Sequence, residues 1–319
     1  MKALKLLLVT IVASVVVSCS NDDYIYDNPG TPISLETLLS NYELWYVDIH
    51  STTGSGSVPF MELAFTMSYR SGRLYANNNL VGIGSNGSGF GIQVGNYTTY
   101  DVYSSTLTIN HDIDGVVDFE VRQLNDNEIS LYDRYENVTY YLQGYQRSTF
   151  DYDQVFYDNI EYFLQEYYGW GKTYRSDGPM HDFDYENYLA FTPENTTTFY
   201  SSEDPLGIDI YDVVWDYVGG YEVYDIEGYD NLKYLTFDYD LGYNEEFELV
   251  VINDGTIELF HINSGVTYQF EGRDLIIILK EGKQQDVKNS KNVRPPVSNA
   301  LHKRTKVKRK TVKRESYLK

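Results

Sequence analysis

The sequence has little cysteine and no apolar run long enough to cross a membrane. Its 319 residues include a single cysteine, Cys19, so no disulfide bond can form within the chain. The apolar run at residues 6–17 is interrupted by Thr10 and Ser14. It is also shorter than the roughly 20 apolar residues that a membrane-spanning helix needs. Neither an internal disulfide framework nor a spanning helix is therefore expected.

Basic residues are also scarce, and they are unevenly placed. Lys and Arg number 25 against 47 Asp and Glu, which gives a net charge of −22. Residues 19–279 hold nine of these basic residues and 44 of the acids, a local net of −35. Residues 280–319 hold fourteen basic residues against three acids, a local net of +11. Because the body is so acidic, we expect no nucleic-acid partner.

The basic segment, residues 280–319, has few apolar residues and contains Pro295-Pro296. This composition predicts a disordered tail that is dispensable for folding. Three interpretations stay open for it. It is an arm for an anionic partner such as lipid head groups or glycan, a solvated tail that folds back on the acidic domains, or an out-of-frame extension of the gene.

Motifs of common catalytic and cofactor sites are missing. None of the five histidines lies three to five residues from another, so their spacing does not indicate a zinc site. No Gly-x-Ser-x-Gly or His-x-Gly-His motif occurs. Residues 82–87 match the dinucleotide string Gly-x-Gly-x-x-Gly, but the Gly-rich, strand-like segment that follows lacks the required helix. We predict no cofactor and name no catalytic residue, so an enzyme is the less favoured class.

Two acidic turns are weak candidates for calcium. Asp112 and Asp114 lie in a segment that resembles the first half of an EF-hand loop, but Val121 stands where the bidentate Glu should be. The corresponding segment further along the chain holds Asp238 and Asp240. An acidic turn between strands is the alternative interpretation, and otherwise no metal site is predicted.

The start of the chain has the parts of an export signal. Lys2 and Lys5 precede the apolar run, and the small residue Ser18 precedes Cys19. Residues 16–19, Val-Val-Ser-Cys, resemble the lipobox of bacterial lipoproteins. That resemblance implies a signal peptide over residues 1–18 and acylation of Cys19, for example with palmitate. The alternative is an ordinary secretory signal with a chance cysteine.

The acidic run after the cysteine, in residues 20–23, is similar to the surface-export signal of Bacteroidota lipoproteins. The resemblance implies a protein that is anchored by lipid in the bacterial outer membrane and displayed on the cell surface. Residues 19–33 would then be an acidic tether.

The acidic body contains a long internal repeat. Residues 107–144 align without gaps on residues 235–272, and thirteen of the 38 positions are identical, including Phe119 with Phe247. A constant offset of 128 residues is too long for a solenoid and indicates two copies of one domain. We place these at residues 34–148 and 149–279.

Each copy is predicted to be mainly β. Apolar residues alternate at period two along residues 119–131 and 247–259. At two turns one copy has Asn where the other has Gly, at Asn127 with Gly255 and at Asn137 with Gly265. We expect left-handed backbone at the last residue of both turns. Seven or eight strands per copy are expected.

A short helix is expected at the start of each copy, over residues 34–41 with Ser34 as N-cap and over residues 155–168. A helix, a Trp on the first strand (Trp45, Trp170) and a meander together resemble lipocalin-like barrels, although the Gly-x-Trp signature is absent. The resemblance implies two tandem antiparallel β-barrels, and a β-sandwich is the alternative fold.

The 33 tyrosines often stand beside acids. They suit either half-buried strands or a contact surface for glycan or protein. We predict a membrane-anchored, non-enzymatic binding or interaction module whose partner is a glycan, a small apolar ligand or an envelope protein. The alternatives are a glycan hydrolase with a carboxylate pair and a structural envelope component.

Overall fold

The computed structural model describes residues 33–84, 90–101, 105–192, 198–240, 242–278 and 309–313. The predicted signal peptide, Cys19, nearly all of the tether and most of the basic tail lie outside the described residues. In the part that is described, no helix is long and apolar enough to pass through a bilayer.

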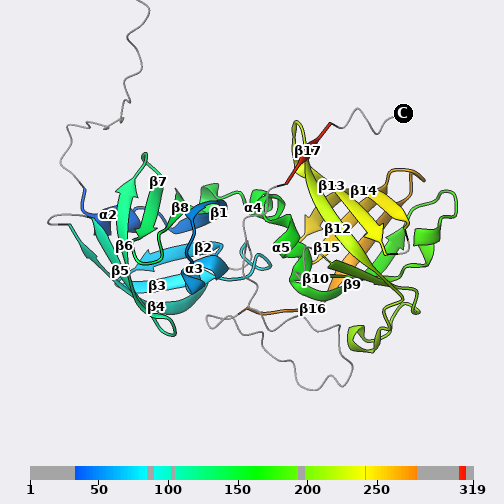
Figure 1. The fold of residues 1–319 in the computed structure, drawn as a ribbon, viewed down its shortest axis with the longest axis horizontal. Helices are drawn as coiled ribbons and strands as arrows, with labels where there is room; N and C mark the ends of the chain where they lie inside the picture. Colours follow the sequence, from blue (N-terminus) through cyan, green and yellow to red (C-terminus); the bar gives the residue numbers. More distant parts are fainter. Residues whose placement is uncertain are drawn as a thin grey trace, which may run out of the picture. The chain divides into compact units, whose positions relative to one another are not determined.

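The first copy is a closed barrel of eight antiparallel strands in sequential order, sealed by pairing of the first strand with the last. Figure 1 shows these strands in blue to green. The helices are α2 (Leu35–Ser40) and α3 (Pro59–Leu63). The strands are β1 (Leu44–Gly54), β2 (Thr66–Arg70), β3 (Arg73–Asn77), β4 (Ile92–Tyr100), β5 (Thr106–His111), β6 (Gly115–Gln123), β7 (Glu128–Asp133) and β8 (Val138–Tyr145).

The second copy is also an eight-stranded antiparallel barrel, which the pairings of β9 with β16 and of β11 with β12 close. Its strands run from green to orange in Figure 1. The helical elements are η2 (Arg147–Thr149), α4 (Tyr152–Asp158), α5 (Ile160–Gln165), η3 (Asp182–Tyr185) and η4 (Ile210–Asp212). The strands are β9 (Tyr167–Arg175), β10 (Tyr188–Thr192), β11 (Thr198–Ser202), β12 (Tyr217–Ile226), β13 (Tyr229–Tyr239), β14 (Asn244–Asn253), β15 (Thr256–His261) and β16 (Thr267–Leu275).

The two barrels are structural copies of one another, as the repeat predicts. Phe119 on β6 pairs with Leu107 on β5, and Phe247 on β14 pairs with Leu235 on β13. All four side chains are fully buried. The fold class of two tandem antiparallel β domains is therefore confirmed, and of the two folds that the sequence left open each copy adopts the barrel.

Each barrel begins with the same short connection from helix to strand. The indole Nε1 of Trp45 donates to the Leu39 carbonyl at 3.0 Å, and that of Trp170 donates to the Leu164 carbonyl at 2.9 Å. Both tryptophans are fully buried. The indole therefore satisfies a carbonyl at the end of the helix that would otherwise have no partner in the core.

The predicted turn conformations are right at one pair of turns and wrong at the other. Asn137 and Gly265 have positive φ angles of 51° and 71°. Gly255 and Asn127 are not among the described residues with positive φ. Their amides instead donate to the side chains of Asn253 and Asn125, at 2.9 and 3.0 Å. These Asx turns make a left-handed residue unnecessary.

The helices that open the barrels also differ in part from the prediction. Ser34 caps α2 as expected and accepts the Thr37 amide at 3.2 Å. The helix expected over residues 155–168 is two helices, separated at Asn159, whose backbone has φ −125° and ψ 34°. The buried side-chain amide of Asn159 donates to the Val155 carbonyl at 3.0 Å, and this carbonyl also accepts the Asn159 backbone amide at 3.2 Å. Such a bond from a side chain to the backbone is typical of a helix end.

Aromatic side chains fill the interior of the second barrel. Phe199 stacks on Phe237 with ring centroids 4.4 Å apart, and Phe183 from η3 lies 4.8 Å from Phe247. These four rings are fully buried. In the first barrel, Phe119, Leu131 and other apolar residues of the strands are likewise fully buried. Apolar and aromatic side chains of the described residues therefore point into both barrels.

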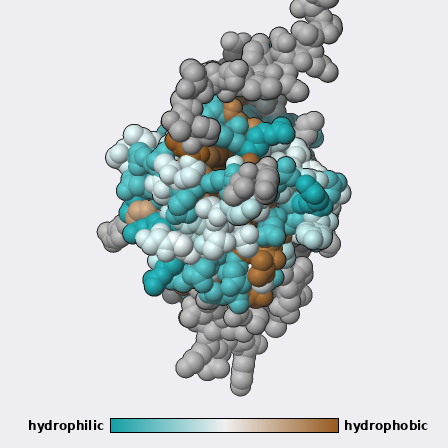
Figure 2. Space-filling view, turned by 90° about the vertical axis from the view of Figure 1, so that its left-hand side faces the viewer, coloured by the Kyte–Doolittle hydropathy of each residue, from teal (hydrophilic) through white to brown (hydrophobic). Residues whose placement is uncertain are grey.

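The face of the molecule that Figure 2 shows is largely polar. Figure 2 shows one face of the molecule in teal and white, with hydrophobic side chains confined to small brown areas. The strands alternate between buried and exposed residues, as in β16, where Tyr268 and Phe270 are buried and Glu271 is exposed. Any partner of this surface therefore meets mainly polar and aromatic groups.

The prediction that the tail lacks fixed structure is wrong for residues 309–313. β17 (Thr311–Val312) pairs in parallel with Asp225 and Ile226 of β12. Arg309 lies 2.9 Å from the Glu161 carboxylate and 3.0 Å from that of Asp225. Glu161 is buried, so Arg309 supplies a partner for a carboxylate that would be costly to leave unpaired in the core. The other tail residues past 278 lie outside the described part of the chain.

Candidate functional site

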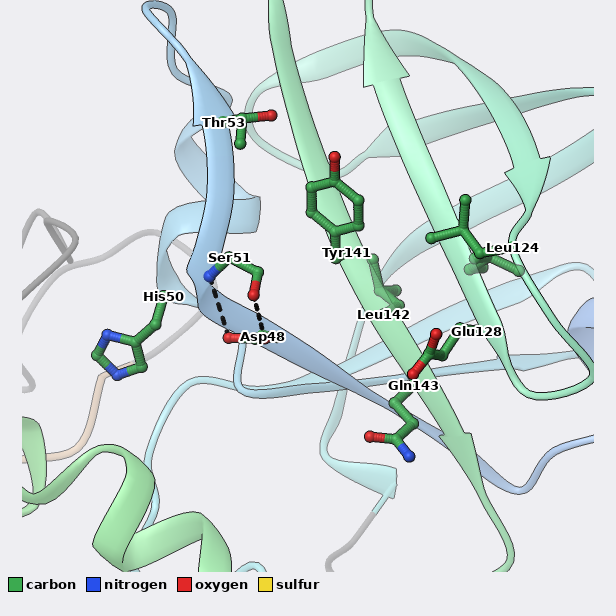
Figure 3. A pocket seen from close by; sticks show the side chains of 10 residues that line it. Asp48, His50, Ser51, Thr53, Leu124, Glu128, Tyr141, Leu142 and Gln143 are labelled. Carbon is green, nitrogen blue, oxygen red and sulfur yellow. Dashed lines mark hydrogen bonds between the residues drawn. The ribbon is translucent and has the colours of Figure 1, made fainter. Parts of the chain in front are cut away.

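One surface pocket lies on the outer face of the first barrel, between β1, β7 and β8. Its volume is about 450 Å³. Figure 3 shows its lining, in which Asp48 and Ser51 are joined by two hydrogen bonds. The Ser51 hydroxyl donates to Asp48 Oδ2 at 2.5 Å and the Ser51 amide donates to Asp48 Oδ1 at 3.1 Å.

Ser, His and Asp all occur at this pocket, but they do not form a catalytic triad. His50 points away from the Asp48–Ser51 pair in Figure 3. A serine nucleophile needs an imidazole to take its proton. The Ser51 proton is directed at a carboxylate instead, so the pocket lacks the arrangement for acyl transfer.

A second surface groove, of about 410 Å³, lies on the outer face of β12, β13 and β14 in the second barrel. Gly220 pairs with Asp238, which pairs with Asn244, while Glu222 pairs with Thr236, which pairs with Glu246. One row of polar side chains thus crosses three neighbouring strands, and the other covers two strands and ends at Gly220. The lining residues are Gly220, Tyr221, Glu222, Tyr224, Thr236, Phe237, Asp238, Asn244 and Glu246.

A few residues determine the open space in the groove and fix the positions of its polar groups. A Cβ atom at Gly220 would meet nothing within 4 Å, so the missing side chain leaves open space at one end. The Asn244 amide, oriented to satisfy its neighbours, donates to Asp238 Oδ1 at 2.8 Å and to the Tyr243 carbonyl at 2.9 Å. The Tyr243 side chain, beside Asn244 in the hairpin, is 70% exposed. The groove therefore contains acceptors in fixed positions, and an exposed aromatic residue precedes Asn244 in the chain.

Polar side chains fasten the η3 segment to one end of the second barrel. Lys172 Nζ donates to the Asp184 carbonyl at 2.6 Å, and burial lowers the pKa of Lys172 to about 8. Arg175 donates to both carboxylate oxygens of Asp184, at 2.6 and 3.0 Å, and the Tyr268 hydroxyl donates at 2.7 Å. Burial opposes the charge on Asp184, but these bonds outweigh it and hold its pKa at about 2.

A buried acid lies next to this segment. The Tyr239 hydroxyl lies 2.8 and 2.7 Å from the two oxygens of Glu186. Burial raises the pKa of the Glu186 carboxyl to about 7, and the nearby negative charge of Glu245 acts in the same direction. Burial also raises the pKa of Tyr239. Glu186 is only 7% exposed, so a large substrate would not reach it.

Two histidines and an acid meet at the same end of the barrel. His261 Nε2 lies 2.7 Å from Glu245 Oε2, and His181 Nε2 lies 3.7 Å from Glu245 Oε1. The three side chains offer ligand atoms that all lie within 4.8 Å of one another. The sequence did not predict this group, because His181 and His261 are 80 residues apart and only the closure of the barrel brings them together.

The four calcium candidates lie in two separate turns. Asp112 and Asp114 follow β5, where Asp114 Oδ2 lies 3.3 Å from His111 Nδ1. Asp238 lines the groove at the end of β13, and Asp240 follows that strand. Within the described residues, neither pair belongs to a group of three potential metal ligands.

Fold and surface together define a tandem β-barrel protein with packed cores, consistent with lipocalin-like barrels, whose polar pockets lie on its outer walls. No protein-family model and no curated protein matches the sequence.

Proposed function

We propose that this chain is a lipid-anchored protein of the bacterial outer membrane that binds a neutral glycan through the groove on β12–β14, without catalysing a reaction. The groove is the observation that carries the proposal. Asp238, Asn244 and Glu222 line the groove and offer acceptors for sugar hydroxyls. Tyr243, the residue before Asn244, is exposed and offers a flat face on which a sugar that extends beyond the groove could stack.

The negative charge of the groove favours neutral glycans over anionic ones. Residues 19–279 carry a net charge of −35, and Glu222, Asp238 and Glu246 line the groove itself. An anionic glycan would be repelled by these carboxylates, whereas a neutral one donates hydroxyl hydrogen bonds to them. A small apolar ligand is a poorer candidate, because aromatic side chains fill the barrel that bears the groove.

The anchor part of the proposal rests on the start of the sequence. Residues 16–19 have the form of a lipobox, and Cys19 is the only cysteine in the chain. Acylation would hold the two barrels at the membrane surface, where the outer walls face extracellular polymer.

A glycan array probed with the full chain in detergent tests the binding. We expect a set of neutral glycans to bind, and we expect Gly220→Phe to abolish binding because the ring fills open space in the groove. Tyr243→Ala should weaken binding at least tenfold, which is about 1.4 kcal/mol of lost stacking. Tyr135→Ala is the matched control, since Tyr135 is 93% exposed on the first barrel. Binding that both groove variants retain would contradict the proposal.

A glycan hydrolase is the second candidate, because Glu186 has the raised pKa of a general acid and lies near Glu245. Its burial and its bonds to Tyr239 count against this reading. Assay of new reducing ends on any bound glycan decides the point, and we expect none. A purely structural envelope component would bind no glycan at all.

A further inference from the structure

We propose that His181, Glu245 and His261 form a binding site for a divalent transition-metal ion, which the ligand chemistry identifies as zinc. Zinc binds imidazole nitrogen and carboxylate oxygen at about 2.0–2.2 Å, so ligand atoms around it lie about 3–3.5 Å apart. Glu245 Oε2 lies 2.7 Å from His261 Nε2, and Glu245 Oε1 lies 3.7 Å from His181 Nε2. The three ligand atoms all lie within 4.8 Å of one another, so small rotations of the side chains would bring them to the coordination distances.

The three ligands come from separate, well-fixed elements. His261 ends β15 and pairs with Phe247 on β14, two residues along the same face from Glu245. His181 is the N-cap of η3, and its amide donates to Asp184 Oδ2 at 2.8 Å. Because Arg175 holds Asp184 in turn, His181 is kept in place before any metal binds.

Burial decreases across the site. The side chain of His261 is fully buried, that of Glu245 is 14% exposed and that of His181 is 26% exposed. The site is thus open on the His181 side, which gives a metal ion a path of entry. Three protein ligands and an open side resemble the arrangement in which water or an external group takes the fourth position.

The hydrogen bonds of the two Nδ1 atoms, which do not face the metal, affect the affinity for zinc. His261 Nδ1 accepts the Ser264 backbone amide at 3.2 Å and lies 2.7 Å from Ser264 Oγ. When Nε2 binds a metal, the ring proton moves to Nδ1, which breaks the bond from the amide and leaves Ser264 Oγ to accept the proton. His181 Nδ1 accepts the Phe183 amide at 3.2 Å. Metal binding through His181 Nε2 moves the ring proton to Nδ1 and breaks that bond. We therefore expect micromolar affinity, weaker than that of a closed structural zinc site.

The ligand set also excludes the hard cations. Calcium and magnesium take oxygen ligands almost throughout, and only one of these three residues supplies oxygen. The site belongs to the second barrel alone. At the repeat offset of 128 residues, Val117 and Asp133 stand in the first barrel where Glu245 and His261 stand in the second. The groove on the outer wall contains none of the three ligands, so the two proposals can fail separately.

A metal ion bound by His181, Glu245 and His261 would link η3 to β14 and β15. It binds the folded protein and not the unfolded chain, so a saturating concentration raises the thermal midpoint. We expect a rise of roughly 5 °C in 100 μM zinc chloride.

Isothermal titration of the full chain, purified without a histidine tag, tests the proposal. We expect one zinc ion per chain in the presence of excess calcium, and cobalt in place of zinc should give visible absorption bands. His181→Gln and Glu245→Gln should each weaken zinc binding at least tenfold and remove the thermal shift. Glu246→Gln and His50→Gln should do neither.

These variants guard against misfolding and nonspecific binding. His181 is the most exposed ligand, so its substitution leaves the core intact even if His261 variants fail to fold. Glu246→Gln removes the same charge as Glu245→Gln, but on the outer face of β14. The proposal is overturned if zinc does not bind in a defined ratio, or if His181→Gln and Glu245→Gln bind it as tightly as the unaltered chain.

Discussion

Tyrosine residues serve two purposes in this chain. Tyr140 and Tyr167 are buried, and their hydroxyls bond to the Val58 amide and the Asp254 carbonyl, both at 2.9 Å. Tyr135 and Tyr243 are 93% and 70% exposed. The sequence allowed a half-buried strand residue or a contact residue, and the structure contains both. Burial of the ring with a bonded hydroxyl builds the core, whereas the exposed rings are available to a partner.

The buried acid Glu186 should make stability depend on pH. Burial raises its pKa from the ordinary value of 4.5 to about 7. Between pH 4.5 and 7 the folded chain keeps a proton on Glu186 that the unfolded chain has lost. The protonated carboxyl therefore contributes fully to the free energy of unfolding below pH 4.5, and this contribution is lost as the pH rises to 7. The loss in the free energy of unfolding is about 3 kcal/mol over that range.

Urea unfolding at pH 5 and pH 8 measures this effect. Between these pH values, the free energy of unfolding of the unaltered chain should fall by about 2 kcal/mol more than that of Glu186→Gln, because glutamine cannot titrate. Glu120→Gln, at an exposed acid of the first barrel, should behave like the unaltered chain. If Glu186→Gln follows the same pH dependence as the unaltered chain, Glu186 is not protonated in the fold.

Acylation of Cys19 should determine whether the protein is attached to the membrane. Cys19→Ala removes the only thiol in the sequence. We expect the variant to take up no palmitate analogue in metabolic labelling and to leave the membrane fraction, because the acyl chains supply the attachment. A labelled variant would show that the lipobox resemblance is misleading.

Among the elements, the short strand β17 offers a test of the tail. Arg309 is paired with the buried Glu161, so Arg309→Ala leaves a charge in the core without this partner. The cost of about 1–3 kcal/mol should lower the thermal midpoint by about 5 °C. Lys313→Ala is the control, since its pair with Glu227 is solvent-exposed and should shift the midpoint by less than about 1 °C.

Removal of residues 309–319 should lower the thermal midpoint as much as Arg309→Ala does. An unchanged midpoint after that truncation would restore the sequence-based expectation that the whole tail is dispensable.

Local sequence patterns predicted the elements well where local chemistry determines them. Alternating apolar residues and the offset of 128 indicated paired strands in two copies, and Asn137 and Gly265 marked left-handed turns. The prediction failed where a side chain competes with the backbone. Asn125 and Asn253 form Asx turns, and Asn159 interrupts a helix. Such competition depends on one hydrogen bond that composition does not reveal.

The candidate sites were harder to predict, because they depend on contacts between distant segments. Asp238 was named as an acid in a turn, but its place in a groove follows from its pairing with Gly220 and Asn244. His181 and His261 have no local spacing that indicates a site. Lys172 and Arg175 fasten the η3 segment that carries His181, and this arrangement exists only in the closed barrel.

In the whole molecule, the proposed lipid anchor at Cys19 would hold the groove of the second barrel at the cell surface. The most direct measurement is the retention of a fluorescent neutral glycan, chosen from the array, by intact cells that produce the protein. Cells with the unaltered chain should retain it. Cells with Cys19→Ala should not, and cells with Gly220→Phe should not, although antibody still detects that variant on their surface. If cells that display Gly220→Phe retain the glycan equally, the groove on β12–β14 is not its binding site.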